Sequence, residues 1–311
     1  CLRASLPLIA DDRALRELKV RTAWRTCPPR HILFATDFSA RCDRSQERAI
    51  QLALQWQARL TVVHVIEDED DFLEQPEMSS VPRAVSRNAI RLREELTGID
   101  GLISAVVVRR GRPLVEIKEI ALWDKADLIV TGISRNETDG RSLLGSTTTS
   151  LLRESGLPVL VVKKKSVDTG DRIVVATDVS PAASAVLETT VRFFRPETLI
   201  LFHAFDPPFK NWVENKEAYS HQFSKDIAQR ARDTLDQSLM TGGACQVQVV
   251  TLEGDPAGQL AEYVDDNDID LVIAGTESRS TILNLFIDSV AGNILHEVQC
   301  DIMIVPSHAH L

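Results

Sequence analysis

The chain has 311 residues, of which 44% are apolar and 26% charged, and its formal net charge is −10. This length is typical of two domains, and the composition is that of an ordinary globular protein. An acidic chain lacks the basic face that general nucleic-acid binding requires, so we expect no nucleic-acid partner. We expect no membrane partner either, because no apolar run reaches the roughly 18–20 residues of a membrane helix.

The cysteine pattern indicates a reducing compartment. There are five cysteines, an odd number, and no two of them form a C-x-x-C pair. Neither a disulfide framework nor a zinc site is therefore predicted, and we expect a cytoplasmic location. Residues 1–29 form an N-terminal extension without the apolar core of a signal peptide. We expect a loosely packed arm that ends at Pro28-Pro29; a short basic helix over Asp11 to Trp24 is the alternative.

Residues 30–165 alternate between apolar runs and helical patterns. The predicted strands are His31–Ala35, Leu60–Ile66, Ile103–Val108, Leu128–Val130 and Val159–Val162, and the predicted helices are Arg44–Ala58, Pro82–Leu96, Pro113–Trp123 and Ser146–Glu154. The strands are continuous apolar runs, which indicates burial on both faces. The expected fold class is therefore α/β, with a mostly parallel sheet between two layers of helices.

The same pattern then occurs a second time. The anchors that recur in order are Ile32–Asp37 as Ile173–Asp178, Gly111-Arg112-Pro113 as Gly254-Asp255-Pro256, and Asp127–Gly132 as Asp270–Gly275. Ordered anchors at near-equal spacing predict a tandem of two α/β domains. The predicted boundaries are 30–165 for the first domain, 166–170 for a linker, 171–307 for the second domain and 308–311 for a tail.

The stretch from Asp127 to Thr148 carries the main candidate site. An apolar run reaches Gly132, a polar loop spans Ile133 to Ser142, and Gly145-Ser146-Thr147 opens the next helix. Backbone N–H groups at a helix N-terminus have no partner within the helix, and the helix dipole favours an anion there. This arrangement of strand, loop and helix start predicts a phosphate-binding site.

The spacing of this stretch resembles that of a known family. Gly132 is followed after two residues by Arg135 and after nine more by Gly145-Ser146. This resembles G-x2-G-x9-G-[S/T], the nucleotide-binding signature of the universal stress protein family. Other shared features are the strand-ending Asp37, the Gly111-Arg112-Pro113 turn and the closing strand Pro158–Val162. The resemblance covers both repeats. It implies two doubly wound domains, each an open five-stranded parallel sheet of order 3-2-1-4-5 with its ligand where the order reverses.

The resemblance also assigns roles in the first domain. Asp37 would meet the adenosine part of ATP, the backbone of Val65 would contact adenine, and the helix start would bind phosphate. ATP is therefore the expected ligand, with Mg²⁺ accompanying it. No catalytic residue and no protein-held metal are expected. The expected nucleotide-binding residues are Ala35, Thr36, Asp37, Val65, Gly132, Arg135, Gly145, Ser146 and Thr147.

Some positions depart from the signature. Arg135 replaces the second glycine; it blocks close backbone approach, yet its guanidinium can pair with phosphate, and the sequence does not rank these effects. In the second domain Ser278 and Asp288 replace two glycines, and the Asp288 carboxylate would occupy the anion site itself. We therefore expect no ATP at the degenerate second site, which comprises Asp178, Gly275, Ser278, Asp288 and Ser289.

Several candidate residues also have a simpler interpretation. Asp37 and Asp178 are also typical of turns that follow a strand. The residues favoured as structural or solvated are His64 and His203 at strand ends, His308 and His310 on the tail, the acidic run Glu67–Asp71, and Lys163–Lys165 as a solvated strand end. No His–Asp arrangement accompanies Ser39 or Ser146, so a hydrolase triad is not supported.

The expected function is a stress-response regulator that binds ATP or a related adenine nucleotide in the first domain. The alternatives are a nucleotide-free adaptor for an unknown protein partner and a slow ATPase, for which no general base is evident. Domains of this family pair through their fifth strands, so the two repeats are expected to form an internal pseudo-dimer. Whether two chains also form a homodimer is left open.

Overall fold

The structure, a computed structural model, describes residues 28–67, 83–135, 142–143, 145–165, 172–177, 183–208, 212, 214–239, 246–275 and 298–306. Side chains are described in these ranges except at 83–84, 134–135, 142–143 and 232–239. No helix among the described residues is long and apolar enough to cross a membrane. Residues 1–27 of the N-terminal arm, the acidic run after Glu67, the linker and the tail histidines lie outside the described residues.

Every predicted strand and helix of the first domain is present within a few residues of its expected bounds, and three further short elements were not predicted. They are β1 (His31–Ala35), the 3₁₀ turn η1 (Ala40–Cys42), α2 (Asp43–Trp56), β2 (Arg59–Ile66), α3 (Arg83–Thr97), β3 (Ile103–Arg110), α4 (Pro113–Asp124), β4 (Leu128–Gly132), β5 (Ser134–Arg135), β6 (Ser142–Leu143), α5 (Ser146–Glu154) and β7 (Val159–Val162). Pro113 occupies the first turn of α4, where its missing N–H costs no hydrogen bond. Gln57 ends α2 in a left-handed conformation, which turns the chain back into β2.

The second domain repeats this order. Its elements are β8 (Ile173–Ala176), α6 (Ala183–Phe194), β9 (Thr198–Phe205), α7 (Lys216–Leu239), β10 (Gln246–Glu253), α8 (Pro256–Asp266), β11 (Leu271–Gly275) and β12 (Asp301–Val305). Asp255 caps α8 by accepting a hydrogen bond of 2.9 Å from the Gly258 N–H.

The strands follow the predicted order in both domains. The first domain runs β3-β2-β1-β4-β7 and the second β10-β9-β8-β11-β12, which is 3-2-1-4-5 in each, with parallel neighbours. β1 lies between β2 and β4, so the direction of chain progression reverses beside it. Ligand crevices form at the carboxyl ends of strands at such a reversal.

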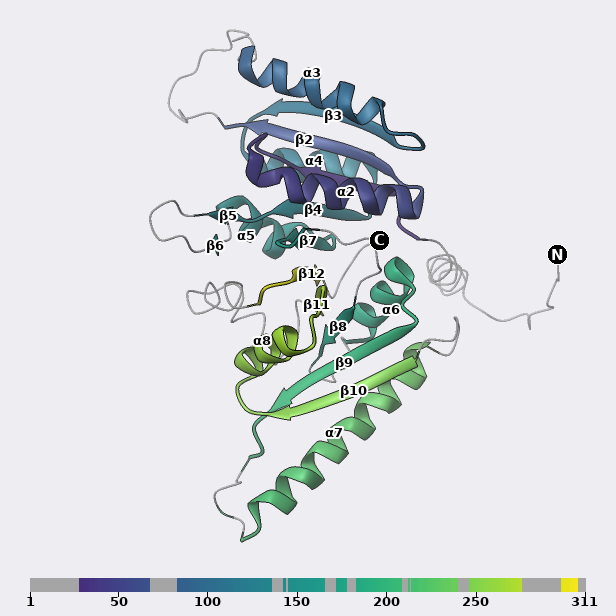
Figure 1. Ribbon diagram of the computed structural model, residues 1–311, viewed down its shortest axis with the longest axis vertical. Helices are drawn as coiled ribbons and strands as arrows, with labels where there is room; N and C mark the ends of the chain where they lie inside the picture. The colour runs from purple at the N-terminus through teal and green to yellow at the C-terminus, as the bar shows by residue number, and fades with distance from the viewer. Residues whose placement is uncertain are drawn as a thin grey trace, which may run out of the picture.

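The two five-stranded sheets join into one. β7 pairs with β12 in antiparallel register, with Leu160 opposite Met303, and the result is a ten-stranded sheet along the long axis of the molecule (Figure 1). These are the fifth strands of the two domains. The expected internal pseudo-dimer is therefore present.

Helices cover both faces of this sheet. The side chains of β1 alternate: Leu33 belongs to one apolar core, and Ile32 and Phe34 belong to the other. The first core receives buried residues of α4, α5 and α8, and the second receives those of α2, α3, α6 and α7. Each core extends through both domains, which fits strands that are apolar on both faces.

The expectation that Lys163 is solvated is wrong. This residue follows β7 at the join of the two sheets and is only 9% exposed. Its ammonium donates a hydrogen bond of 2.7 Å to the Val298 carbonyl. Its backbone N–H, and that of Lys164, donate to the Asp301 carboxylate at 2.7 and 3.0 Å. Three consecutive lysines are typical of a solvated segment, but residues of the second domain cover Lys163.

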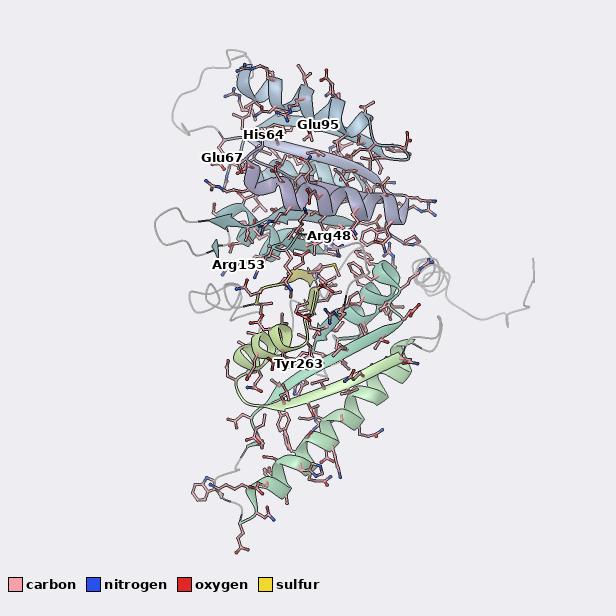
Figure 2. All side chains as sticks on the ribbon, in the orientation of Figure 1. Arg48, His64, Glu67, Glu95, Arg153 and Tyr263 are labelled. Carbon is pink, nitrogen blue, oxygen red and sulfur yellow. The ribbon has the colours of Figure 1, made fainter. Side chains whose placement is uncertain are left out.

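Other contacts across the join involve the helices beside it. Buried Arg48 of α2, near the middle of the molecule in Figure 2, lies 3.7 Å from the Asp301 carboxylate. Arg192 of α6 forms an ion pair of 3.1 Å with Asp127. Trp56 of α2 packs edge-on against two phenylalanines of α6, Phe193 and Phe194. The join therefore combines strand pairing, buried charge and an aromatic cluster.

The polar loop expected at 133–142 contains regular structure at its ends. Ser134 and Arg135 pair antiparallel with Ser142 and Leu143 as the short strands β5 and β6. Each strand has two residues, too few for a visible sequence period. The sequence therefore predicted a loop where the structure has a small hairpin base.

The buried Lys163 predicts a pH dependence of stability. Burial lowers its pKa from 10.5 to about 8, although Cys300 and Asp301 act in the opposite direction. Between these values the unfolded chain holds a proton that the folded chain has released, so stability rises with pH. From pH 8 to 10.5 we expect the free energy of unfolding to rise by roughly 3 kcal/mol relative to a Lys163→Met variant.

Urea unfolding of both proteins across this pH range measures the difference. Lys165→Met, a change at an exposed position of the same run, is the control and should follow the wild type. Parallel pH profiles for wild type and Lys163→Met would contradict the burial of this charge.

Candidate functional site

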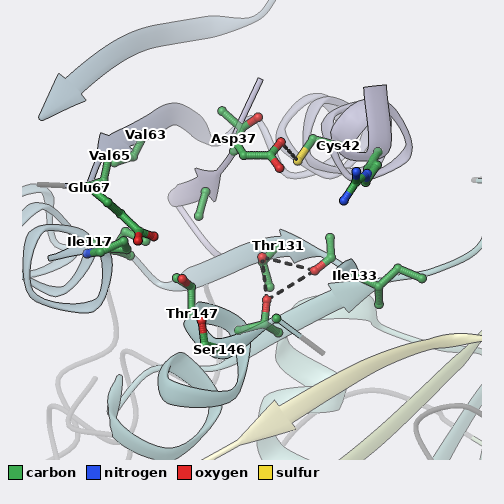
Figure 3. Close-up of a pocket in the computed structure, with 17 residues that line it drawn as sticks. Asp37, Cys42, Val63, Val65, Glu67, Ile117, Thr131, Ile133, Ser146 and Thr147 are labelled. Atoms are coloured by element: carbon green, nitrogen blue, oxygen red, sulfur yellow. Dashed lines mark hydrogen bonds between the residues drawn. The ribbon is translucent and has the colours of Figure 1, made fainter. Parts of the chain in front are cut away.

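A cleft of about 290 Å³ opens at the carboxyl ends of β1 and β4 (Figure 3). β1 contributes the turn that follows Ala35, and β4 contributes Thr131 and Gly132. The start of α5, the start of α4 and the end of β2 complete its walls. The cleft lies at the order reversal that the strand topology creates.

The structure brings most of the predicted site residues together here. The cleft is lined by Ala35, Thr36, Asp37, Val65, Gly132, Gly145, Ser146 and Thr147. The backbone of Arg135 lies in β5 just beyond Gly132, and its side chain is outside the described residues. Of the degenerate second site, Gly275 ends β11, while Asp178, Ser278, Asp288 and Ser289 are outside the described part of the chain.

Asp37 lies in a turn after β1, as its simpler interpretation predicted, and it also lines the cleft. Its Oδ1 accepts hydrogen bonds from the Ser39 N–H at 2.7 Å and from the Cys42 thiol at 3.1 Å. Burial alone would raise the pKa of Asp37, but the hydrogen bonds from Ser39 and Cys42 and the charge of Arg41 lower the pKa below its usual value. Asp37 is therefore a carboxylate at neutral pH, held in place by the turn.

The start of α5 provides the anion-binding end of the cleft. Gly145 precedes the helix in an extended conformation and, as a glycine, has no side chain with which to cap the first turn. Thr148 holds this turn against β4, since its hydroxyl lies 3.4 Å from the Gly132 carbonyl and 3.3 Å from the Thr131 hydroxyl. Backbone N–H groups in a first helical turn have no acceptor within the helix, and the helix dipole favours an anion there.

The cleft also contains residues that sequence analysis did not assign to it. Two are charged: Arg41 of η1 and Glu67 after β2. The others are Cys42, Val63, Pro113, Ile117, Thr131, Ile133 and Thr148. Thr131 and Thr148 had a signal, since they neighbour Gly132 and Thr147 in the chain. Arg41 and Glu67 follow Asp37 and Val65 by a few positions, but no sequence pattern assigned either charged side chain to the cleft.

One end of the cleft is apolar. Val63 and Val65 of β2 lie opposite Ile117 of α4, and the Glu67 side chain points into the same end in Figure 3. This shape fits a flat ring with polar atoms on its edge. Beside Asp37, burial raises the pKa of the Cys42 thiol, which is consistent with a neutral donor to that carboxylate.

His64 has the structural role that the sequence favoured. Its Nδ1 lies 2.9 Å from the Thr36 carbonyl, and its ring stacks on Phe38 with 4.4 Å between ring centres. Phe38 has a positive φ of 61° in the turn after β1. His203 repeats the contact in the second domain, 2.7 Å from the Thr177 carbonyl. Both histidines brace the chain as it leaves the first strand of their domain.

The fold and the cleft define a class of protein: tandem doubly wound domains with a ligand cleft at the strand-order reversal. Comparison with known families gives the same result, because the sequence model of the universal stress protein family matches residues 29–163 and 170–306. The chain therefore belongs to the universal stress protein family.

Individual relatives share one or both domains. A universal stress protein of Mycobacterium bovis is 27% identical over 266 residues, which span 79% of this chain and 86% of the relative. A universal stress protein of Thermus aquaticus is 32% identical over 133 residues, which span 42% of this chain and 97% of the relative. The crystal structure of a putative universal stress protein from Pseudomonas aeruginosa has a TM-score of 0.62 at 18% identity, covering 93% of this chain and 97% of that one. This last likeness concerns the fold.

Packing around Gly132 predicts a coupled effect on stability. A Cβ at this position would lie 3.0 Å from the Ser45 hydroxyl, which itself donates to the Cys42 carbonyl. We expect Gly132→Ala to cost about 1 kcal/mol because Ser45 must move. In a Ser45→Ala background the same change should cost roughly nothing, since the contact is gone and alanine restricts the unfolded chain. Urea unfolding of the four proteins measures the coupling; equal costs in both backgrounds would contradict it.

Proposed function

We propose that the first domain binds ATP or a related adenine nucleotide, and that the bound state regulates a stress response through a protein partner. The observation that carries this proposal is the convergence of Asp37, Gly132 and the start of α5 on one cleft. The second domain then has a structural role or binds another ligand.

Each part of the cleft suits one part of the nucleotide. The start of α5 offers the N–H groups and hydroxyls of Ser146 and Thr147 to the phosphates, and Arg41 lines the same cleft. The carboxylate of Asp37 can accept hydrogen bonds from ribose hydroxyls. The apolar end beside Val65 can hold the base. Mg²⁺ would enter with the nucleotide, because phosphate oxygens and water supply most of its ligands.

Two other functions are tested by separate variants. A nucleotide-free adaptor is favoured by the arginine at position 135, where the family signature has glycine. If Arg135→Gly binds ATP and the wild type does not, the wild-type site has lost nucleotide binding through Arg135. If Arg135→Gly binds ATP more weakly than the wild type, Arg135 is a phosphate ligand.

Slow ATP hydrolysis is the third function. Phosphate release that persists in Asp37→Ala would come from a contaminant.

Titration with fluorescently labelled ATP tests the main proposal. We expect saturable binding by the wild type and at least about tenfold weaker binding by Asp37→Ala, because charge-assisted hydrogen bonds contribute roughly 1.5–3 kcal/mol. The matched control is Glu95→Ala, which removes an exposed carboxylate of α3 whose partner is Arg91. The proposal is contradicted if the wild type does not bind at millimolar ATP. It is also contradicted if Glu95→Ala loses as much ATP affinity as Asp37→Ala.

The position of Glu67 predicts which bases are accepted. A carboxylate at the apolar end can accept a hydrogen bond from the 6-amino group of adenine, but it repels the 6-oxygen of guanine. We expect the wild type to prefer ATP to GTP, and Glu67→Gln to reduce this preference about tenfold, or roughly 1.4 kcal/mol. Competition of each nucleotide against labelled ATP measures the ratio. An unchanged ratio in Glu67→Gln would show that Glu67 does not contact the base edge.

A further inference from the structure

The helix α4 is apolar on two faces. Ile117, Ile120 and Ala121 are buried against the sheet. On the other side Val115 is 42% exposed, Leu122 79% and Trp123 85%. The spacing i, i+4, i+7 and i+8 puts Val115, Glu119, Leu122 and Trp123 on one stripe of the helix. An exposed apolar stripe of this kind is typical of a contact surface.

A groove of about 400 Å³ lies beside this stripe, between α4 and β3. Trp123 lines it, with Ile120 and Val107 as its apolar floor. Three carboxylates, Glu116, Glu119 and Asp124, and the guanidinium of Arg109 also line it. Asp124 is already paired with Arg59 at 3.3 Å, so the acidic character of the groove rests on Glu116 and Glu119. The groove therefore fits a segment that is both apolar and basic.

The second domain shows that the fold does not require this surface. Aligning Pro256 with Pro113 places Gly258, Gln259, Glu262, Asp265 and Asp266 at the outward positions of α8. These residues have the same burial classes as their counterparts in α4. Where α4 exposes Leu122 and Trp123, α8 exposes Asp265 and Asp266. The apolar stripe is thus a property of the first domain alone.

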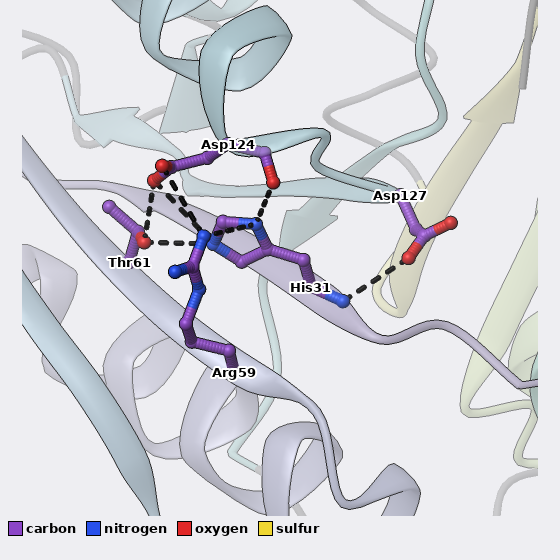
Figure 4. Close-up of polar contacts among 5 residues, drawn as sticks. All are labelled: His31, Arg59, Thr61, Asp124 and Asp127. Carbon is purple, nitrogen blue, oxygen red and sulfur yellow. Dashed lines mark hydrogen bonds and ion pairs between the residues drawn. The ribbon is translucent and has the colours of Figure 1, made fainter.

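The described chain begins at the end of this groove. The His31 Nδ1 lies 2.6 Å from the carbonyl of Asp124, the residue that follows Trp123 (Figure 4). The N–H of Arg30 donates a hydrogen bond of 2.7 Å to Asp127, and Pro29 is buried. Residues 1–27 precede this point, which lies near the C-terminal end of α4. Extended, they span roughly 90 Å, whereas α4 is only about 18 Å long.

The sequence of residues 1–27 complements the groove. This segment has six basic residues, Arg3, Arg13, Arg16, Lys19, Arg21 and Arg25, against three acidic ones, Asp11, Asp12 and Glu17, in a chain of net charge −10. Its apolar residues include Leu15, Leu18 and Trp24. Basic and apolar residues therefore alternate in a segment that joins the described chain near an acidic and apolar groove.

We propose that residues 11–24 of the same chain bind the groove between α4 and β3 and cover Leu122 and Trp123. The apolar residues of the segment contact the stripe, and its arginines pair with Glu116 and Glu119. The inference stands independently of nucleotide binding, since the groove and the nucleotide cleft are separate.

Hydroxyl-radical footprinting with mass spectrometry of the full chain tests this proposal. Trp212 of the second domain is 87% exposed and serves as an internal reference for Trp123. If the segment is docked, Trp123 should be oxidised at least about fivefold more slowly than Trp212, because docking removes most of its exposed surface. Equal oxidation of the two residues would overturn the proposal.

Charge reversal identifies the occupant. Glu116→Lys/Glu119→Lys in the groove and Arg13→Glu/Arg16→Glu in the segment should each bring Trp123 to the oxidation rate of Trp212. Combining all four changes should restore protection, because the charges are complementary again. Protection that ignores the segment variant, or that is not restored in the combined variant, overturns the assignment. Protection that disappears on dilution would show that a second copy covers the groove, and it also overturns the proposal.

A variant that copies the second domain separates release of the segment from unfolding of the protein. Leu122→Asp/Trp123→Asp gives α4 the outward residues that α8 carries, so the helix should still fold and the urea midpoint should fall only by what release of the segment costs. Its segment should be released, and trypsin should cleave after Arg13, Arg16 or Arg21 several-fold faster than in the wild type. Unchanged cleavage with an unchanged midpoint would overturn the proposal.

Discussion

The antiparallel pairing of β7 with β12 makes one structure of the two domains. Each is the fifth strand of its domain, and an edge strand leaves backbone N–H and C=O groups without partners. Pairing satisfies both edges at once and joins the two sheets. Asp301 closes the join by accepting two backbone hydrogen bonds from Lys163 and Lys164. The repeat cannot form the same contact on the other side, because Pro158 stands where Asp301 does and has no carboxylate, and Pro306 stands where Lys163 does and has no N–H to donate.

The helix α2 connects this join to the cleft. Its N-terminal end adjoins Arg41 and Cys42, which line the cleft, and Ser45 lies against Gly132. One turn further on, Arg48 lies beside the Asp301 carboxylate. The Arg44 guanidinium also donates a hydrogen bond of 3.0 Å to the Lys163 carbonyl. The geometry of the cleft and that of the domain join therefore depend on the same rigid element.

Duplication has kept the frame and changed its surfaces. Both domains have the same strand order, the same histidine contact to the turn after the first strand, and a proline at the same helix start. The outward faces of α4 and α8 differ, one apolar and the other acidic. The signature residues differ as well, since Asp288 stands where the first domain has Gly145. Core positions are constrained by packing on both faces, whereas surface positions are free to acquire separate roles.

The sequence by itself determined the elements and their order, because apolar runs and helical periods report burial within a single segment. Strands such as His31–Ala35 and the helix Ser146–Glu154 were predicted to the residue. It also determined the tandem repeat. Most of the residues predicted for the site line the cleft, and they lie at strand ends or at the start of a helix. Only the tertiary structure decided that Lys163 is buried, that Arg41 and Glu67 share the cleft, and that α4 exposes Trp123. These properties depend on contacts between segments far apart in the chain, such as Lys163 and Asp301, and no local period records which segments meet.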